Sequence, residues 1–477
     1  MKKAILKPAT PATARAPSHK KFYFCILLLY QYSPIHSISP SMKYTYRKGF
    51  KWLFIYFLLA LLPLIVAALG KIPEYRSFAV EAGAALGFIG LGMLGLQFLF
   101  SGRIKWVAPY YGMDNILQYH REMGILAFLF VMAHPVTLII AEPDFLAYFN
   151  PAENLPRAMA LVFVSVALIL LTASSLWRLT FGLSYEMWRL VHGILSLAVI
   201  FIGVVHSLQV SHYLNALWQQ LAIIIILGAY GYLVIHTRII RPWRISKKPY
   251  AVEEVIAERD DCWTLKLQPQ GHPGMRYKAG QFVWITLGHT PFSMQQHPFS
   301  LASAANDSTI LLTGKNSGDF TSTWKDVKPG TRAFLEGPFG SFYPEAGKNL
   351  FMVMGGIGIT PAMSMLRTLR KENDSRQAVL VYANPDWEGI TFREELDMLS
   401  KETNLKLVHV LEEAPEGWQG ETGMINIDVL KRHMPENSED YAFYLCGPKP
   451  MQDAAELALR DLGVDWRWLY SERFQII

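Results

Sequence analysis

Long apolar runs separated by short polar connections fill the first half of the chain. Six of these runs are long enough to cross the hydrocarbon core of a bilayer, which takes about 20 helical residues. They lie near 52–70, 78–100, 115–140, 157–177, 187–209 and 214–237. The pattern predicts a membrane domain of six transmembrane helices.

The pattern changes after Lys248. Residues 250–345 hold short alternating runs such as FVWITL, TILLTG and RAFLEG between glycines and prolines, which predicts an antiparallel β-barrel. Residues 348–477 alternate strand-like runs (NLFMVM, QAVLVYAN, LKLVHVLEE and YAFYLCGP) with helical ones, which is typical of a doubly wound α/β sheet. We therefore predict a multidomain protein: a six-helix bundle at 42–245, a barrel domain at 246–345 and an α/β domain at 346–477.

The first 41 residues fit none of these domains. They are basic and rich in proline and alanine, and their apolar run FYFCILLLY is too short to span a bilayer. We interpret 1–41 as an extension that is not native, with Met42 as the true start; a signal peptide is the alternative.

Composition narrows the possible functions. The chain is 51% hydrophobic, its net charge of +6 is small for 477 residues, and it has only three cysteines, which are far apart. No nucleic-acid partner, disulfide framework or Cys-x-x-Cys metal site is expected. Lysine and arginine concentrate before the first span, in alternate connections and after the sixth span, so we expect both termini and the soluble domains to be cytoplasmic.

Four histidines repeat one spacing on the third and fifth spans. His134 follows His120 by the interval at which His206 follows His192, since 134 − 120 = 206 − 192. On a helix this interval is a rise of about 21 Å and nearly whole turns, so each helix carries two imidazoles on one face. Both spans run from inside to outside, which pairs His120 with His192 on the cytoplasmic side and His134 with His206 on the outer side.

Facing imidazoles in an apolar bundle suit the two axial positions of haem iron, so we predict two haem b groups. Three alternatives stay open: histidines that only pack or hydrogen-bond, a zinc site, and His212 in place of His206.

The soluble half carries two motifs at expected strand ends. The turn GGIGITP follows a buried strand and opens a helix, where backbone N–H groups can approach a phosphate. CGP follows another strand, and its cysteine could face a nicotinamide. A tight strand–helix turn and a buried cysteine are the alternatives. The residues concerned are Gly355, Gly356, Gly358, Thr360, Pro361, Cys446, Gly447 and Pro448.

Two further motifs follow strands of the expected barrel. In HPFS (His297, Pro298, Phe299, Ser300) the hydroxyl and the ring are suited to hold a flavin edge. In GDFT (Gly318, Asp319, Phe320, Thr321) the turn offers backbone donors to a pyrophosphate. The order of barrel, HPFS, GDFT, GGIGITP, CGP and a terminal aromatic residue is more specific than any single motif.

Residues 249–477 resemble the ferredoxin–NADP reductase family, and residues 50–237 resemble the ferric-reductase-like transmembrane domain of ferric reductases and NADPH oxidases. The resemblance implies that His120, His134, His192 and His206 bind two haems and that FAD lies on HPFS and GDFT. It also implies that Phe474 covers the flavin and that Ser300, Cys446 and Phe474 surround the hydride-transfer site.

The resemblance implies a membrane oxidoreductase that passes electrons from NAD(P)H through FAD and two haems to an outer acceptor. We favour oxygen, which would give superoxide; a ferric chelate is the alternative, as is an electron-supply subunit for a quinone or periplasmic partner. A further alternative function is that of a transporter or structural membrane protein with a vestigial flavin domain. NADPH is favoured over NADH, although Pro385 stands where an arginine is usual and Arg393 or Arg370 would have to replace it. A bacterial inner membrane is the expected location.

Overall fold

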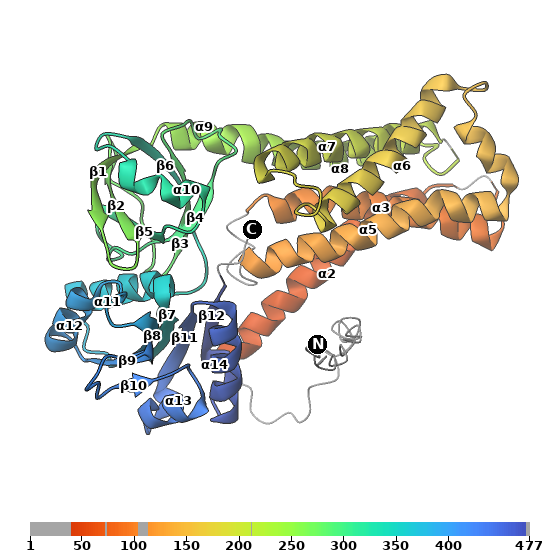
Figure 1. Cartoon of the computed structure of the whole chain (residues 1–477). Coiled ribbons are helices and arrows are strands. Elements are labelled where there is room, and N and C mark those ends of the chain that lie inside the picture. Colours follow the sequence, from red (N-terminus) through yellow and green to blue (C-terminus); the bar gives the residue numbers. More distant parts are fainter. Residues whose placement is uncertain (1–39, 72–73, 104–112, 211, 474–477) are drawn as a thin grey trace, which may run out of the picture. The chain divides into compact units, whose positions relative to one another are not determined.

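Within the described residues, six long helices make up the first half of the chain, as the apolar runs predict. The computed structural model describes residues 40–71, 74–103, 113–210 and 212–473 (Figure 1). From Gly49 onwards these residues form one compact unit. The helices that are long and apolar enough to span a bilayer are α2 (Pro40–Ala68), α3 (Phe78–Ser101), α5 (Met113–Ala141), α6 (Leu155–Leu176), α7 (Tyr185–Gln209) and α8 (Leu217–Ile235).

The sixth helix continues beyond its predicted end. After α8 the chain forms a π-helical turn, η2 (His236–Ile240), and then the short helix α9 (Arg241–Ser246). The apolar run alone could not predict this extension, because the added residues are rich in arginine.

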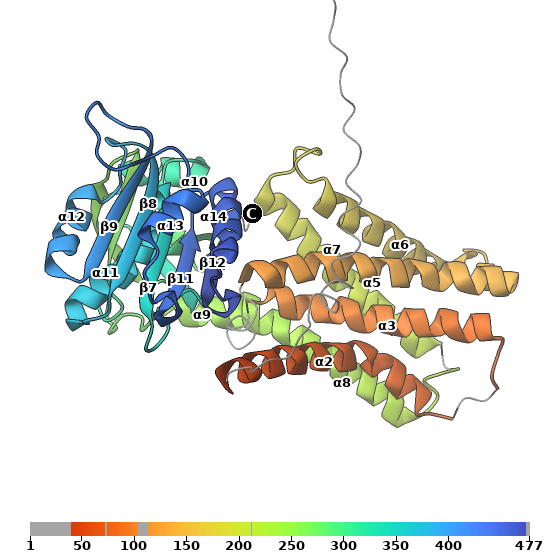
Figure 2. The same ribbon diagram turned by 90° about the horizontal axis from the view of Figure 1, so that it is seen from below.

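Helices α3 and α5 lie side by side along much of their length (Figure 2). Glycines on α3 permit this approach. A Cβ atom on Gly83, Gly87 or Gly90 would stand 2.5–2.9 Å from side chains of α5. Small residues let transmembrane helices pack closely in this way.

The barrel region is a six-stranded antiparallel sheet with the order β4-β3-β6-β1-β2-β5. Buried aliphatic residues such as Leu265, Ile285 and Leu312 fill its inner face. The strands are β1 (Tyr250–Ala257), β2 (Cys262–Pro269), β3 (Phe282–Leu287), β4 (His297–Ser300), β5 (Ile310–Lys315) and β6 (Arg332–Phe339).

The last part of the chain is a parallel sheet with the order β10-β9-β8-β7-β11-β12. The four expected strands are β7 (Asn349–Gly355), β8 (Ala378–Asp386), β9 (Leu405–Glu413) and β11 (Tyr441–Cys446). The pattern missed β10 (Glu421–Thr422) and β12 (Leu469–Glu472), which are too short to show a periodicity.

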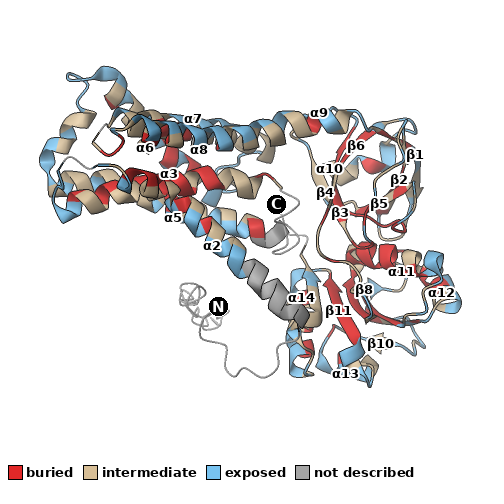
Figure 3. Cartoon of the chain, turned by 180° about the vertical axis from the view of Figure 1, so that it is seen from behind, coloured by how far each residue is buried: buried red, intermediate tan, exposed pale blue. Residues whose placement is uncertain are grey.

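Helices cover both faces of this sheet, as a doubly wound fold requires. Alternate residues of β7 point to opposite sides. Met352 packs in a core with α11 (Thr360–Glu372) and α12 (Arg393–Glu402), whereas Phe351 packs with α13 (Ile427–His433) and α14 (Lys449–Asp461). The buried strands between these layers are red in Figure 3.

The barrel and the parallel sheet share one packed interface. Helix α11 donates from Ser364 Oγ to Ser303 O at 2.7 Å and from Arg367 to Ala302 O at 2.7 Å. Ala302 and Ser303 directly follow the HPFS strand and Leu301. Hydrogen bonds therefore hold the segment after this motif against α11 of the α/β domain.

Candidate functional site

The two histidine pairs expected from the sequence spacing are both present between α5 and α7. The ring centroids of His120 and His192 lie 6.3 Å apart, and those of His134 and His206 are also 6.3 Å apart. Helix α5 packs along α3, but it approaches α7 mainly through these rings. The bundle therefore holds two matched pairs of imidazole rings between α5 and α7.

The spacing of each pair fits a metal bound between the two rings. An imidazole nitrogen binds a first-row metal ion at about 2.0–2.1 Å. Each nitrogen lies a little over 1 Å from its own ring centre, so two axial imidazoles place their centroids roughly 6 Å apart. The observed 6.3 Å agrees with this value. The residues present thus fit a haem iron at each level.

Hydrogen bonds at Nδ1 orient two of the four rings. His134 Nδ1 lies 2.8 Å from Gly83 O, so it carries the proton and donates to that carbonyl. His192 Nδ1 lies 3.3 Å from Ser175 Oγ. Such partners leave Nε2 as the free ligand nitrogen and fix the ring plane.

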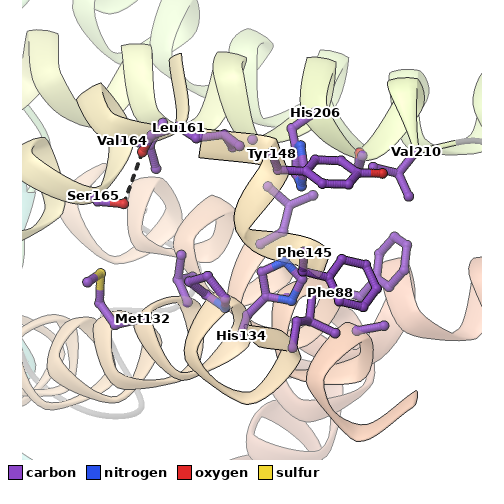
Figure 4. A pocket seen from close by; sticks show the side chains of 18 of the residues that line it. Phe88, Met132, His134, Phe145, Tyr148, Leu161, Val164, Ser165, His206 and Val210 are labelled. Atoms are coloured by element: carbon purple, nitrogen blue, oxygen red, sulfur yellow. Dashed lines mark hydrogen bonds between the residues drawn. The ribbon is translucent and has the colours of Figure 1, made fainter. Parts of the chain in front are cut away.

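A cavity of about 180 Å³ opens beside the pair of His134 and His206, the pair expected on the outer side (Figure 4). Both His134 and His206 line it, and the other lining residues are almost all apolar. His206, and not the alternative His212, is thus the partner that faces His134 across the cavity.

Aromatic residues from a short 3-10 helix, η1 (Pro143–Phe149), line this cavity, and we call η1 its cover. Arg157 holds η1 in place by donating to Ala147 O at 3.2 Å, and its guanidinium lies 4.4 Å from the Tyr148 ring centre. Neither Phe145 nor Tyr148 was expected at a site from the sequence, although the cluster DFLAYF in a short connection was a possible signal.

The zinc alternative finds no support in the described part of the chain. It contains no group of three or more histidine, cysteine, aspartate or glutamate side chains that could hold a metal ion. A tetrahedral zinc site needs such a cluster.

The HPFS motif forms β4, and its serine hydroxyl is buried. Ser300 Oγ has no hydrogen-bond partner among the described residues. Buried polar groups are nearly always paired, so an orphaned hydroxyl at this position fits the polar edge of a bound flavin. His297 stacks on Phe320 of the GDFT motif with ring centroids 4.0 Å apart, which brings these two motifs together. Burial lowers the pKa of His297 and favours the neutral ring.

The two nucleotide motifs meet backbone to backbone. The chain passes from β7 through a 3-10 turn (Gly356–Ile359) into α11, which is the expected strand–turn–helix. A Cβ atom on Gly358 would lie 2.5 Å from Cys446 O, and one on Gly447 would lie 3.0 Å from Gly355 N. Only glycine permits this approach, and Gly356 (φ +50°) and Gly447 (φ +158°) also use backbone angles that favour glycine.

Strand β12 ends next to these motifs, since Glu472 pairs with Cys446 across the sheet. Phe474 lies outside the described residues, as do most of residues 1–41, so the predictions for Phe474 and for the start of the chain stay predictions.

Three family models match successive parts of the chain. Residues 86–203 match a ferric reductase like transmembrane component, residues 248–342 an FAD-binding domain, and residues 352–456 an oxidoreductase NAD-binding domain. The chain carries a ferric-reductase-like transmembrane domain joined to a flavin- and nicotinamide-binding module. The ferric-reductase-like match contains three of the four histidines, His120, His134 and His192, and ends just before His206.

Two curated relatives each match less than half of this chain. NADH-cytochrome b5 reductase 1 from Mortierella alpina is 33% identical over 192 residues, which is 39% of this chain and 64% of the relative. The protein of the same name from Candida albicans is 27% identical over 235 residues, covering 48% of this chain and 80% of the relative. The chain thus spans less than two thirds of the Mortierella protein.

Among solved structures, the FAD/NAD-binding domain of nitric oxide dioxygenase from Vibrio cholerae is 24% identical. The alignment covers 47% of this chain and 97% of that one, with a TM-score of 0.42.

Proposed function

We propose that the protein is a flavocytochrome b that carries electrons from cytoplasmic NAD(P)H, by way of FAD and two haem b groups, to oxygen on the outer side. The observation that carries the proposal is the presence of two pairs of imidazole rings between α5 and α7. In each pair the ring centroids lie 6.3 Å apart. The matched family models for the membrane, FAD and NAD domains support the electron donor side.

Bound FAD would convert a hydride into single electrons, and bound haem would relay them one at a time. The chain supplies the positions for this chemistry. His120 with His192 and His134 with His206 would hold the two irons, and HPFS with GDFT would hold the flavin. The glycine turn at 355–358 and the CGP turn at 446–448 would hold the nicotinamide nucleotide, with Cys446 beside its ring.

The cover over the outer cavity supports oxygen as the acceptor. Phe145 and Tyr148 enclose the space next to His134 and His206, and Arg157 holds their segment. A small neutral molecule can reach such an apolar cavity more easily than a bulky charged ferric chelate. The product of one-electron transfer would then be superoxide.

The position of the arginines supports NADH as the donor over NADPH. Arg370 lies ten residues into α11 and so about 15 Å from the glycine turn, and it pairs with Glu402. Arg393 follows the carboxyl end of β8, the end of the sheet where a 2′-phosphate would lie. Its guanidinium, however, stacks on Trp387 and donates to Trp387 O. The relatives are named NADH-cytochrome b5 reductases, which agrees with this choice.

Purified protein supplemented with FAD tests the proposal directly. We expect the absorption bands of low-spin cytochrome b, two haems per flavin, and superoxide-dismutase-sensitive reduction of a reporter dye on addition of NADH. Rapid ferric-chelate reduction with slow oxygen consumption would instead favour the metal reductase. Absence of haem bands would overturn the flavocytochrome assignment.

A further inference from the structure

A largely but not fully buried carboxylate of the flavin domain lies between two arginines of the membrane domain. Glu336 on β6 accepts from Arg103 at 2.8 Å through one oxygen and from Arg241 at 2.7 Å through the other. The side chains of Glu336 and Arg103 are each 12% exposed, and that of Arg241 is 20% exposed. We call these three residues the docking clamp.

The clamp draws on two separate membrane helices. Arg103 follows the end of α3, whereas Arg241 begins α9 beyond the π-helical turn. Arg241 also donates to Gly102 O at 2.8 Å, which ties the two helix ends together. Arg103 has φ +49°, a backbone angle that is uncommon outside glycine and persists only where contacts hold it.

The clamp is connected to the flavin motif across the sheet. Glu336 pairs with Trp284 on β3, and Trp284 pairs with Pro298 of HPFS on β4. The Arg103 guanidinium lies 3.8 Å from the centre of a Trp284 ring and donates to Gln296 Oε1 at 3.0 Å. Gln296 directly precedes the motif. Arginine stacked on an aromatic face and bonded to a carboxylate is held in one orientation.

A second contact joins the same region to the inner histidine pair. Arg189 on α7 donates to Met294 O at 3.2 Å. Arg189 lies three residues before His192, and Met294 lies three residues before His297. An unbroken path of covalent bonds and one hydrogen bond thus links the flavin motif with the helix that carries an inner histidine.

The charges of the clamp depend on one another, so the loss of any one of them should be costly. Burial alone would raise the pKa of the Glu336 carboxyl, but Arg103 and Arg241 outweigh burial and hold the pKa below its usual range. Removing one partner from a buried ion pair leaves an uncompensated charge, which is far more costly than losing a surface pair. Apolar residues around it, including Phe282, Trp284 and Phe339, pack with residues of α3, α5 and α8.

We propose that Glu336 is a positioning residue that docks the flavin domain against the inner histidine pair and thereby sets the rate at which the inner haem is reduced. This inference rests on the proposed function. Glu336 would not touch the cofactors; it would act through the arginines and through Trp284.

The test compares Glu336→Gln with the wild-type protein, both loaded with FAD and haem and mixed anaerobically with NADH. The substitution keeps the size of the side chain and removes its charge. We expect flavin reduction at the wild-type rate, but haem reduction slowed at least about tenfold, because small displacements between reacting groups can cost about 100-fold. Glu421→Gln, which removes an ion-paired carboxylate from the α/β domain, is the matched control and should change neither rate.

Hydrogen–deuterium exchange provides a readout that is independent of activity. In Glu336→Gln we expect faster exchange in peptides covering 294–300 and 332–339, with unchanged exchange in the parallel sheet. If Glu336→Gln fails to assemble, Arg103→Lys decides the matter, because it keeps the charge and loses the forked geometry and the stacking on Trp284.

Three outcomes separate the hypotheses. Wild-type haem reduction in a folded clamp variant would overturn the docking role. Equal slowing of flavin and haem reduction would also overturn it, because Glu336 would then support the flavin site itself. A wild-type protein without haem bands would instead overturn the proposed function.

Discussion

A methyl group on Gly87 would stand 2.8 Å from Nδ1 of His134, the nitrogen that donates to Gly83 O one turn earlier on α3. The backbone of α3 at Gly87 thus lies so close to the His134 ring that no side chain fits between them. Because its close neighbour is an imidazole nitrogen that already has a hydrogen-bond partner, the ring could yield only by losing that bond.

We expect Gly87→Ala to turn His134 away from His206 and to lower haem content by roughly half, since overpacking a tight site costs about 1–3 kcal/mol. Pyridine haemochrome and flavin assays on the purified protein measure this ratio. Gly228→Ala is the control, because a Cβ atom there meets nothing within 4 Å. An unchanged haem-to-flavin ratio in Gly87→Ala would contradict the assignment of His134.

Opening the cover of the outer cavity should change the acceptor. Tyr148→Ala removes a ring that lines the cavity and on which Arg157 stacks. We expect the ratio of ferric-chelate reduction to superoxide formation to rise several-fold, because larger molecules gain access. Tyr75→Ala, at an exposed residue between α2 and α3, should leave the ratio unchanged. The same ratio in both variants would mean that the cover does not select the acceptor.

The donor preference can be tested through the partners of Arg393. We expect kcat/KM for NADH to exceed that for NADPH in the wild-type protein. The double substitution Glu388→Gln and Glu394→Gln removes the carboxylates near Arg393 and should narrow this difference. Glu402→Gln releases Arg370 at the far end of α11 and is the control. A wild-type preference for NADPH would show that Arg393 already serves the 2′-phosphate.

Acid should destabilise the α/β domain through Glu421. The hydrogen bond from Arg432, with a further contribution from His433, lowers the pKa of this carboxyl from 4.5 to about 2. Because the folded pKa is below the unfolded one, the stabilisation is complete above pH 4.5 and is lost as the pH falls towards about 2. Thermal unfolding followed between these values should show a smaller pH dependence in Glu421→Gln. Glu388→Gln, at an exposed carboxylate, should behave as the wild-type protein does.

The elements with strong periodicity were predictable from the sequence. Six apolar runs gave six helices, and four buried strands of the parallel sheet appeared where expected, because burial in lipid or between two helix layers demands continuous apolar sequence. The equal spacing of the histidines also anticipated which rings would face each other.

The contacts between distant parts of the chain were not predictable in this way. In the sequence, Arg103, Arg189 and Arg241 stand out only as part of the positive charge that orients the helices. Their partner Glu336 is 233 residues from Arg103, and no local pattern marks it. Likewise, the contact of Gly87 with His134 depends on how α3 packs on α5, which the order of residues along the chain does not reveal.

The π-helical turn between α8 and α9 has a consequence for how the two halves of the chain can evolve. A residue gained or lost within His236–Ile240 would rotate everything that follows by about 100° about the helix axis. Arg241 would then leave Glu336, although every residue of the clamp would still be present. The phase of one helical turn, as much as the identity of any side chain, therefore sets which face the flavin domain presents to the membrane helices.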